Sequence, residues 1–151
     1  MTSLGRMVCL VFGVLLAAGC SAQRATTEPV KSTTLENVQW TLVQLDGKAI
    51  EPSSRGAPTL MLSSKDMRLS GFAGCNRMLG GYELNGETLK FNAMATTRMA
   101  CIDVTPEEPL LLALGATARW KVVGNTLELF DASGNTRTRW TVTMIESGDR
   151  K

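Results

Sequence analysis

The side chains that could do chemistry in this chain of 151 residues are cysteines, carboxylates, serines and lysines, because the sequence contains no histidine. Histidine is the commonest general base and metal ligand, so its absence removes every Ser-His and Cys-His nucleophile. A Ser-Lys pair is formally open through Ser63, Ser64 and Lys65, but an expected turn makes these ordinary solvated residues. We therefore expect no enzyme activity and no catalytic residue.

The sequence also gives no pattern for a metal or a cofactor. The cysteines have no histidine partners for a zinc site, and the acids show no calcium-loop pattern. The glycine-rich stretch from Gly71 to Gly81 lacks the strand-then-helix setting and the Lys-Ser/Thr ending of a phosphate loop. Its glycines favour a sharp, close-packed backbone turn instead. We expect neither a metal nor a cofactor.

The N-terminus is typical of an export signal. Arg6 precedes an apolar run from Met7 to Leu16, which is shorter than the roughly 20 residues of a spanning helix. The next residues, Ala-Ala-Gly-Cys, resemble a bacterial lipobox, although Ala17 stands where Leu is usual. We expect a signal peptide at residues 1–19 and a lipid on Cys20. An ordinary cleaved signal and an uncleaved anchor are the alternatives.

The residues after Cys20 predict where the protein lies. Ser21 follows the cysteine, and by resemblance to bacterial sorting patterns the absence of Asp there favours the outer membrane, facing the periplasm. Residues 20–37 have few large apolar side chains, which indicates a lipidated N-terminus with a flexible tether. An edge strand or a partner-binding peptide is the alternative. The predicted location is the cell envelope, with the membrane as a partner through the anchor.

Two cysteines remain for a disulfide. Cys9 lies in the predicted signal and Cys20 takes the lipid, which leaves Cys75 and Cys101. Two thiols in an oxidising compartment predict one disulfide, and its loop of about 26 residues would stabilise the fold by roughly 3 kcal/mol. Two separately buried free thiols are the alternative.

The charged residues argue against a nucleic-acid partner. The chain has 16 Lys and Arg against 14 Asp and Glu, and these residues are scattered along the sequence. Nucleic-acid binding needs a concentrated basic face. The length predicts one domain with one core, which we expect to be a monomer.

After residue 37 the sequence is typical of short strands separated by turns. Alternating apolar residues predict strands around Trp40, Leu60, Leu69 and Trp140. Within the first of these strands the apolar phase slips to Val43 and Leu45, which predicts a bulge. Met67 is expected on the same strand face as Leu69.

Two hairpins are predicted by matching sequences. Residues 82–91 carry Asn85-Gly86 between alternating arms, and Asn-Gly favours a type I′ turn. Residues 120–129 align with this segment without a gap when Gly124 is placed on Gly86. The match fits an internal duplication or convergence on good hairpin chemistry, and in both cases each hairpin has one apolar face.

One helix is predicted between the hairpins. Thr105 is expected as its N-cap and Pro106 as its first residue, unless the helix begins nearer Pro109. A core-facing stripe follows at helical spacing, with a partner-binding surface as the alternative: Leu110, Leu111, Leu114 and Ala118. The predicted fold is mixed and mainly antiparallel β, a rolled sheet or small barrel of about seven to nine strands with one helix packed against it.

Two segments make the chain recognisable. Residues 70–77 read Ser-Gly-Phe-Ala-Gly-Cys-Asn-Arg, and residues 95–101 read Ala-Thr-Thr-Arg-Met-Ala-Cys. With an early Trp-Thr-Leu and a closing Leu-Glu-Leu, they resemble the META-domain family of HslJ-like (DUF306) bacterial lipoproteins. The resemblance implies a META domain at residues 38–146, a tail at residues 147–151, and a non-enzymatic envelope protein linked with heat shock or stress.

The residues beside the two cysteines form the candidate site. Asn76 can hold a positive φ and bond to neighbouring backbone groups, and a disulfide would bring Arg77 and Arg98 into one neighbourhood. The two cations could bind a carboxylate or phosphate. Bonding to backbone carbonyls or to Asp103, or simple exposure, is the alternative. The methionines are expected mostly in the core, with an apolar ligand pocket among them as a further alternative.

These features predict a non-catalytic, stress-related binding module tethered to the membrane. Its partner would be an envelope protein or a small hydrophobic ligand. The alternative is a protein inhibitor, or an assembly or pilot module, that acts on a cell-wall hydrolase or a secretion component.

Overall fold

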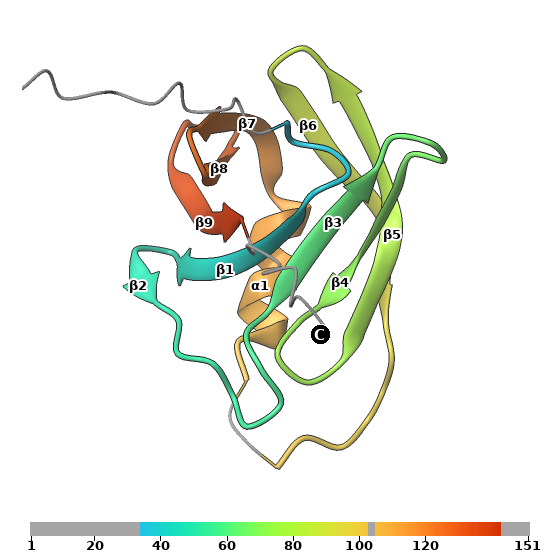
Figure 1. Ribbon diagram of the computed structural model, residues 1–151, viewed down its shortest axis with the longest axis vertical. Helices are drawn as coiled ribbons and strands as arrows, with labels where there is room; N and C mark the ends of the chain where they lie inside the picture. Colours follow the sequence, from blue (N-terminus) through green and yellow to red (C-terminus); the bar gives the residue numbers. More distant parts are fainter. Residues whose placement is uncertain (1–33, 103–104, 143–151) are drawn as a thin grey trace, which may run out of the picture.

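The computed structural model describes residues 34–102 and 105–142 (Figure 1). The predicted signal, Cys20, most of the tether, Asp103 and the tail lie outside these ranges, so the expectations for them stay predictions. The described elements are β1 (Gln39–Leu45), β2 (Lys48–Ala49), β3 (Thr59–Ser63), β4 (Arg68–Phe72), β5 (Arg77–Asn85), β6 (Thr88–Thr96), α1 (Glu107–Gly115), β7 (Thr117–Val123), β8 (Thr126–Asp131) and β9 (Thr136–Val142). No helix in the described part of the chain is long and apolar enough to cross a membrane.

The strands form one antiparallel sheet that closes on itself. Neighbours follow the order β1, β3, β4, β5, β6, β7, β8 and β9, and β9 pairs again with β1. The short β2 adds to the end of β1. The fold is therefore an eight-stranded antiparallel barrel with one extra strand and one short helix, which confirms the predicted fold class.

The helix α1 connects β6 to β7, the two neighbouring barrel strands that share the fewest residue pairs. β6 and β7 share a single residue pair, Thr88 with Arg119. In Figure 1, α1 lies behind β1, between the β7–β9 part and the β3–β6 part of the barrel, and it contacts β1, β6 and β9. The helix buries Leu110, Ala113 and Leu114 completely, so it contributes to the same core as the strands.

Alternation along the strands fills the barrel with large side chains. The fully buried ones include Trp40, Trp140, Leu42, Leu60, Leu62, Leu69, Met78, Leu89, Leu127 and Leu129. The inward phases predicted for Trp40, Leu60, Leu69 and Trp140 are thus confirmed. The prediction that Met67 shares the face of Leu69 is wrong. Met67 precedes β4 with φ 53° and is 41 % exposed, because the turn into β4 directs it outward.

The predicted bulge in β1 is present. The register opposite β9 shifts between Leu42 and Gln44, and Leu45 returns to the core at 6 % exposure. Val43, which was expected to face inward with Leu45, is 41 % exposed. The extra residue of a bulge is left out of the alternation, and here that residue faces solvent.

Both predicted hairpins form, and the first turns one residue later than its Asn-Gly implies. Asn85 pairs with Thr88, so Gly86 and Glu87 are the two loop residues, and only Gly86 of the two has positive φ, 56°. The second hairpin is equivalent, since Val123 pairs with Thr126 and Gly124 has φ 58°. A glycine at the first loop position is typical of a type II′ turn, so the predicted type I′ turn is wrong.

The helix begins one residue later than predicted. Its N-cap is Pro106, without a side-chain capping bond, and its first residue is Glu107. Leu110 and Leu114 face the core as predicted, whereas Leu111 is only partly buried. Ala118 lies in β7, because the helix ends at Gly115.

The packed part of the chain begins before Val38, the predicted first residue of the domain. Leu35 is 3 % exposed, and its carbonyl oxygen accepts a hydrogen bond from Trp40 Nε1 at 2.9 Å. Asn37 N donates to the Leu62 carbonyl at 2.7 Å. Leu35 and Asn37, which were predicted to belong to the flexible tether, are thus part of the packed domain.

Tyr82 ties this N-terminal segment to the barrel. Its side chain is buried, and its hydroxyl hydrogen-bonds to the Glu36 carboxylate and lies 3.0 Å from the Ser63 carbonyl oxygen. Burial, and secondarily the bond to Glu36, raise the pKa of Tyr82 well above its usual value.

We expect alkaline pH to destabilise the fold through Tyr82. A raised folded-state pKa stabilises the fold fully below the unfolded value of about 10, and this stabilisation is lost as pH rises above it. Tyr82 is the chain's single tyrosine, so tyrosinate absorbance reports on this group alone. Tyrosinate should appear together with unfolding, and Tyr82→Phe should be less stable at pH 7 by about 1 kcal/mol but lose less stability above pH 10. Tyrosinate formed near pH 10 in a folded chain would contradict this.

Candidate functional site

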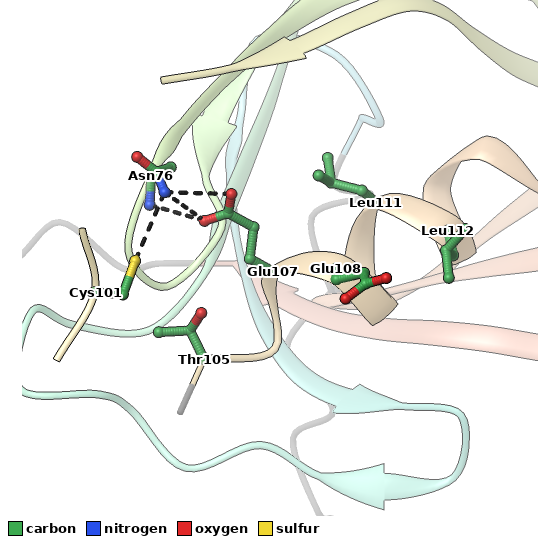
Figure 2. Close-up of a pocket in the computed structure, with 7 residues that line it drawn as sticks. All are labelled: Asn76, Cys101, Thr105, Glu107, Glu108, Leu111 and Leu112. Carbon is green, nitrogen blue, oxygen red and sulfur yellow. Dashed lines mark hydrogen bonds between the residues drawn. The ribbon is translucent and has the colours of Figure 1, made fainter. Parts of the chain in front are cut away.

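Asn76 is the buried centre of the region that carries the recognisable segments. It is 5 % exposed and ends the turn between β4 and β5, where Ala73 N donates to its carbonyl oxygen at 2.8 Å. Figure 2 shows its side chain facing the Glu107 carboxylate, to which Nδ2 donates at 3.0 Å. The backbone N–H of Asn76 donates to the same carboxylate at 3.1 Å. This turn is therefore attached to the first residue of α1.

The same side chain also holds the segment of residues 97–101. Asn76 Oδ1 accepts hydrogen bonds from Met99 N at 2.8 Å and from Thr97 Oγ1 at 2.9 Å. Its Nδ2 lies 3.4 Å from the Met99 carbonyl oxygen and 3.7 Å from Cys101 Sγ. One amide thus joins three chain segments. Its backbone is not in the positive-φ region that the sequence suggested, because Gly74, with φ 100°, makes the turn instead.

A disulfide fastens two of these segments. Cys75 is bonded to Cys101 with their Cα atoms 6.0 Å apart. This is the predicted pair, so the alternative of two free thiols does not hold. Cys75 is buried and Cys101 is exposed, so the bond links the core side of the turn to a surface segment.

Glu107 is the residue of this site that sequence reasoning missed. Its position in a Thr-Pro-Glu-Glu stretch indicated only a helix start, and nothing in the sequence pairs it with Asn76, 31 residues away. With Glu108 and the Asn76 amide it lines a hollow of about 460 Å³ beside α1. Cys75, Cys101 and Glu107 have ligand-type atoms within 4.8 Å of one another, but the two sulfurs are joined and offer no thiolate to a metal.

Arg77 and Arg98 lie on neighbouring segments, as predicted. Arg77 N donates to Thr97 Oγ1 at 3.1 Å, and Thr97 N donates to the Arg77 carbonyl at 3.0 Å. Both side chains are exposed, and within residues 34–102 and 105–142 neither guanidinium has a hydrogen-bond or ion-pair partner. The predicted bonding to backbone carbonyls is therefore absent from the described part.

A second hollow adds a cation that the sequence did not indicate. We call it the outer hollow; it measures about 790 Å³, and its lining includes Arg55, Ser70, Phe72, Arg77, Leu79 and Met99. Arg98 is not among the described residues that line it. The structure thus groups Arg77 with Arg55, which sits in the loop between β2 and β3.

Comparison with known protein families assigns the chain that carries this site to one of them. Residues 33–143 match the META domain. The chain belongs to the META-domain family. Its segments around Asn76 and Cys101 are therefore those of a META domain, as their resemblance implied. Comparison with curated proteins gave no match.

Solved structures agree with the META fold. An NMR structure of a protein from Burkholderia xenovorans is 32 % identical, with a TM-score of 0.60 over 73 % of this chain and 84 % of the other. A second NMR structure is 25 % identical, with a TM-score of 0.56 over 72 % and 91 %. A DUF4847-family protein from Bacteroides vulgatus shares the fold at 13 % identity, with a TM-score of 0.54 over 71 % and 93 %.

The methionines of this META domain do not form one core group. Met78 is fully buried, and Met94 packs partly against the core. Met61, Met67 and Met99 are each two-fifths exposed or more. The expectation that the methionines mainly fill the core is therefore wrong for these three residues.

Reducing the disulfide should lower the melting temperature of the META domain by several degrees. Opening a loop of about 26 residues removes roughly 3 kcal/mol of stabilisation from a domain of this size. Calorimetry of the wild type with and without a phosphine reductant measures the effect. Cys101→Ser, at an exposed position, should melt at the reduced wild-type temperature and ignore the reductant. An unchanged wild-type melting temperature would contradict the prediction.

Proposed function

We propose that this META-domain protein is a non-catalytic binding module of the cell envelope, anchored by a lipid on Cys20 and related to stress. The observation that carries the non-catalytic part is the bonding of the site itself. The Asn76 side chain hydrogen-bonds to the Glu107 carboxylate and to Thr97 and Met99. Within the described residues, no buried side-chain nitrogen or oxygen is left without a partner. These polar groups serve the fold, and binding falls to the surface around them.

The anchor part rests on the sequence. A lipobox-like cysteine followed by a polar tether would concentrate the domain at a membrane surface, and two or more acyl chains hold stably where one does not. Ser21 favours the periplasmic face of the outer membrane over the inner membrane.

Metabolic labelling with an alkyne analogue of palmitate tests the anchor. The wild type should incorporate the label and fractionate with outer membranes, whereas Cys20→Ala should lose both. Equal labelling of the two proteins would overturn the anchor. Protein levels after a temperature upshift test the link with stress, and an unchanged level would remove it.

An assembly or inhibitor module is the second candidate, because apolar side chains are exposed around the disulfide. Ile102 is fully exposed, Leu112 is 66 % exposed and Met99 is 45 % exposed. A photo-crosslinking residue placed at Ile102 should capture an envelope protein if this surface docks one. The matched control is the same residue at Val123, which is 59 % exposed in the β7–β8 hairpin. Equal products at both positions would contradict a specific protein partner.

A further inference from the structure

The outer hollow lies on the outward face of three adjacent strands. Register places Thr59 of β3 beside Phe72 of β4, and Phe72 beside Arg77 of β5. In the next outward-facing row, Ser70 of β4 pairs with Leu79 of β5. These positions alternate with the residues that fill the core, so the barrel fixes their spacing from behind.

Two cations line this hollow without an acid to neutralise them. Arg55 and Arg77 are the charged residues among the described lining, and neither guanidinium has an acidic or hydrogen-bond partner in the described part of the chain. The loop that carries Arg55 is tied down, since Ser53 Oγ donates to the Gly74 carbonyl at 2.9 Å. Two unneutralised guanidiniums favour an anion, and they bind carboxylate and phosphate oxygens particularly well.

Apolar side chains stand beside these cations. Leu79 is 59 % exposed, Met99 is 45 % exposed, and Phe72, which lines the same hollow, is half-buried. A ligand that covers such exposed apolar side chains removes them from water, and this lowers the free energy of the complex. A volume of about 790 Å³ lies within the range of small-molecule sites.

We propose that the outer hollow binds an amphiphile with a single anionic group, carboxylate or phosphate, and an alkyl chain. The inference rests on the proposed binding function and names its ligand class. The anionic group lies between Arg55 and Arg77, and the chain covers Leu79 and Met99. The recognisable META segments then acquire a role in binding, because Asn76 and the disulfide hold the wall that carries Thr97 and Met99.

Calorimetric titration of the full chain tests this proposal. Cys20→Ser serves as the background, so that the protein's own lipid cannot occupy the hollow. The probes are dodecyl phosphate and laurate below their micelle concentrations, with dodecanol as the uncharged chain and inorganic phosphate as the free anion. We expect one saturable site for at least one of the two anionic amphiphiles, and at least tenfold weaker binding of dodecanol and inorganic phosphate. Comparing the two amphiphiles shows whether the site prefers the phosphate or the carboxylate.

Substitutions locate the site. Arg55→Gln and Arg77→Gln should each weaken binding about tenfold through loss of a charge-assisted bond, and Leu79→Ser should weaken it several-fold. Arg98→Gln is the matched control, because it removes an exposed cation next to Thr97 but outside the hollow. All four should keep the background melting temperature, which shows that they fold.

Three outcomes would overturn the proposal. One is binding of dodecanol as tight as that of the anionic amphiphiles, and another is equal loss of binding in Arg98→Gln and Arg77→Gln. The third is no binding of either anionic amphiphile. None of these touches the proposed function, which the labelling and crosslinking experiments decide separately.

Discussion

Replacing Gly71 with alanine is expected to destabilise the barrel by about 3 kcal/mol or more, or to prevent folding. A Cβ atom at this position would lie 2.2 Å from the Thr59 carbonyl oxygen and 2.6 Å from Met78 Cε. Met78 could move its flexible end, but Thr59 O belongs to the backbone of β3, the strand that pairs with β4 here. Relief would require the two strands to separate, and overpacking of a close-packed interior costs 1–3 kcal/mol even with softer contacts.

Urea denaturation of Gly71→Ala and Gly115→Ala separates this steric effect from the general effect of losing a glycine. Gly115 ends α1, and a Cβ there would meet only Met94 Cε at 3.8 Å, an ordinary contact. Neither glycine has positive φ, so backbone strain enters neither comparison. Gly115→Ala should be neutral or more stable by about 0.5 kcal/mol. Equal stability of the two variants would contradict the close approach at Gly71.

The barrel was largely predictable because its signals are local. Alternation in strands such as β3 and the glycines at positions 86 and 124 depend on neighbouring residues, so strand faces and hairpins followed from the sequence. The turn type was missed because Asn-Gly and Gly-Glu loops differ by one step of register, which cross-strand pairs such as Tyr82 with Phe91 decide. Barrel closure depends on β1 pairing with β9, a contact without a local signal.

The candidate site was predictable only in part, for the same reason. The cysteine pair followed from elimination, since the other two cysteines lie in the predicted signal and at the predicted lipid site. Glu107 lies beside Asn76, and Arg55 lies beside Arg77 in the outer hollow. Both residues come from segments distant in the sequence, and only the fold brings them there. Asn76 was expected to shape its own turn, whereas its amide bonds to segments 21 to 31 residues away.

Removing the Asn76 amide is the second change with a large expected effect. Asn76→Ala should lower the free energy of unfolding by about 3 kcal/mol, because Met99 N, Thr97 Oγ1 and the Glu107 carboxylate all lose a part-buried hydrogen bond to the buried Asn76 side chain. Asn92→Ala is the matched control. Asn92 is exposed and has one side-chain bond, to Glu83 at 3.3 Å, so its loss should cost no more than about 0.5 kcal/mol.

Asn76→Asp distinguishes this bonding role from a simple loss of volume. The substitution keeps the shape but places a second carboxylate against Glu107, and the neighbouring negative charge raises the pKa of the introduced aspartate. A folded-state pKa raised above the unfolded value of about 4 gives a stabilisation that is present below that value and is lost as pH rises. The deficit of the variant against wild type should therefore be largest at pH 7 and shrink towards pH 4. Chemical denaturation at several pH values measures this. A deficit independent of pH would mean that Glu107 does not face residue 76 in solution.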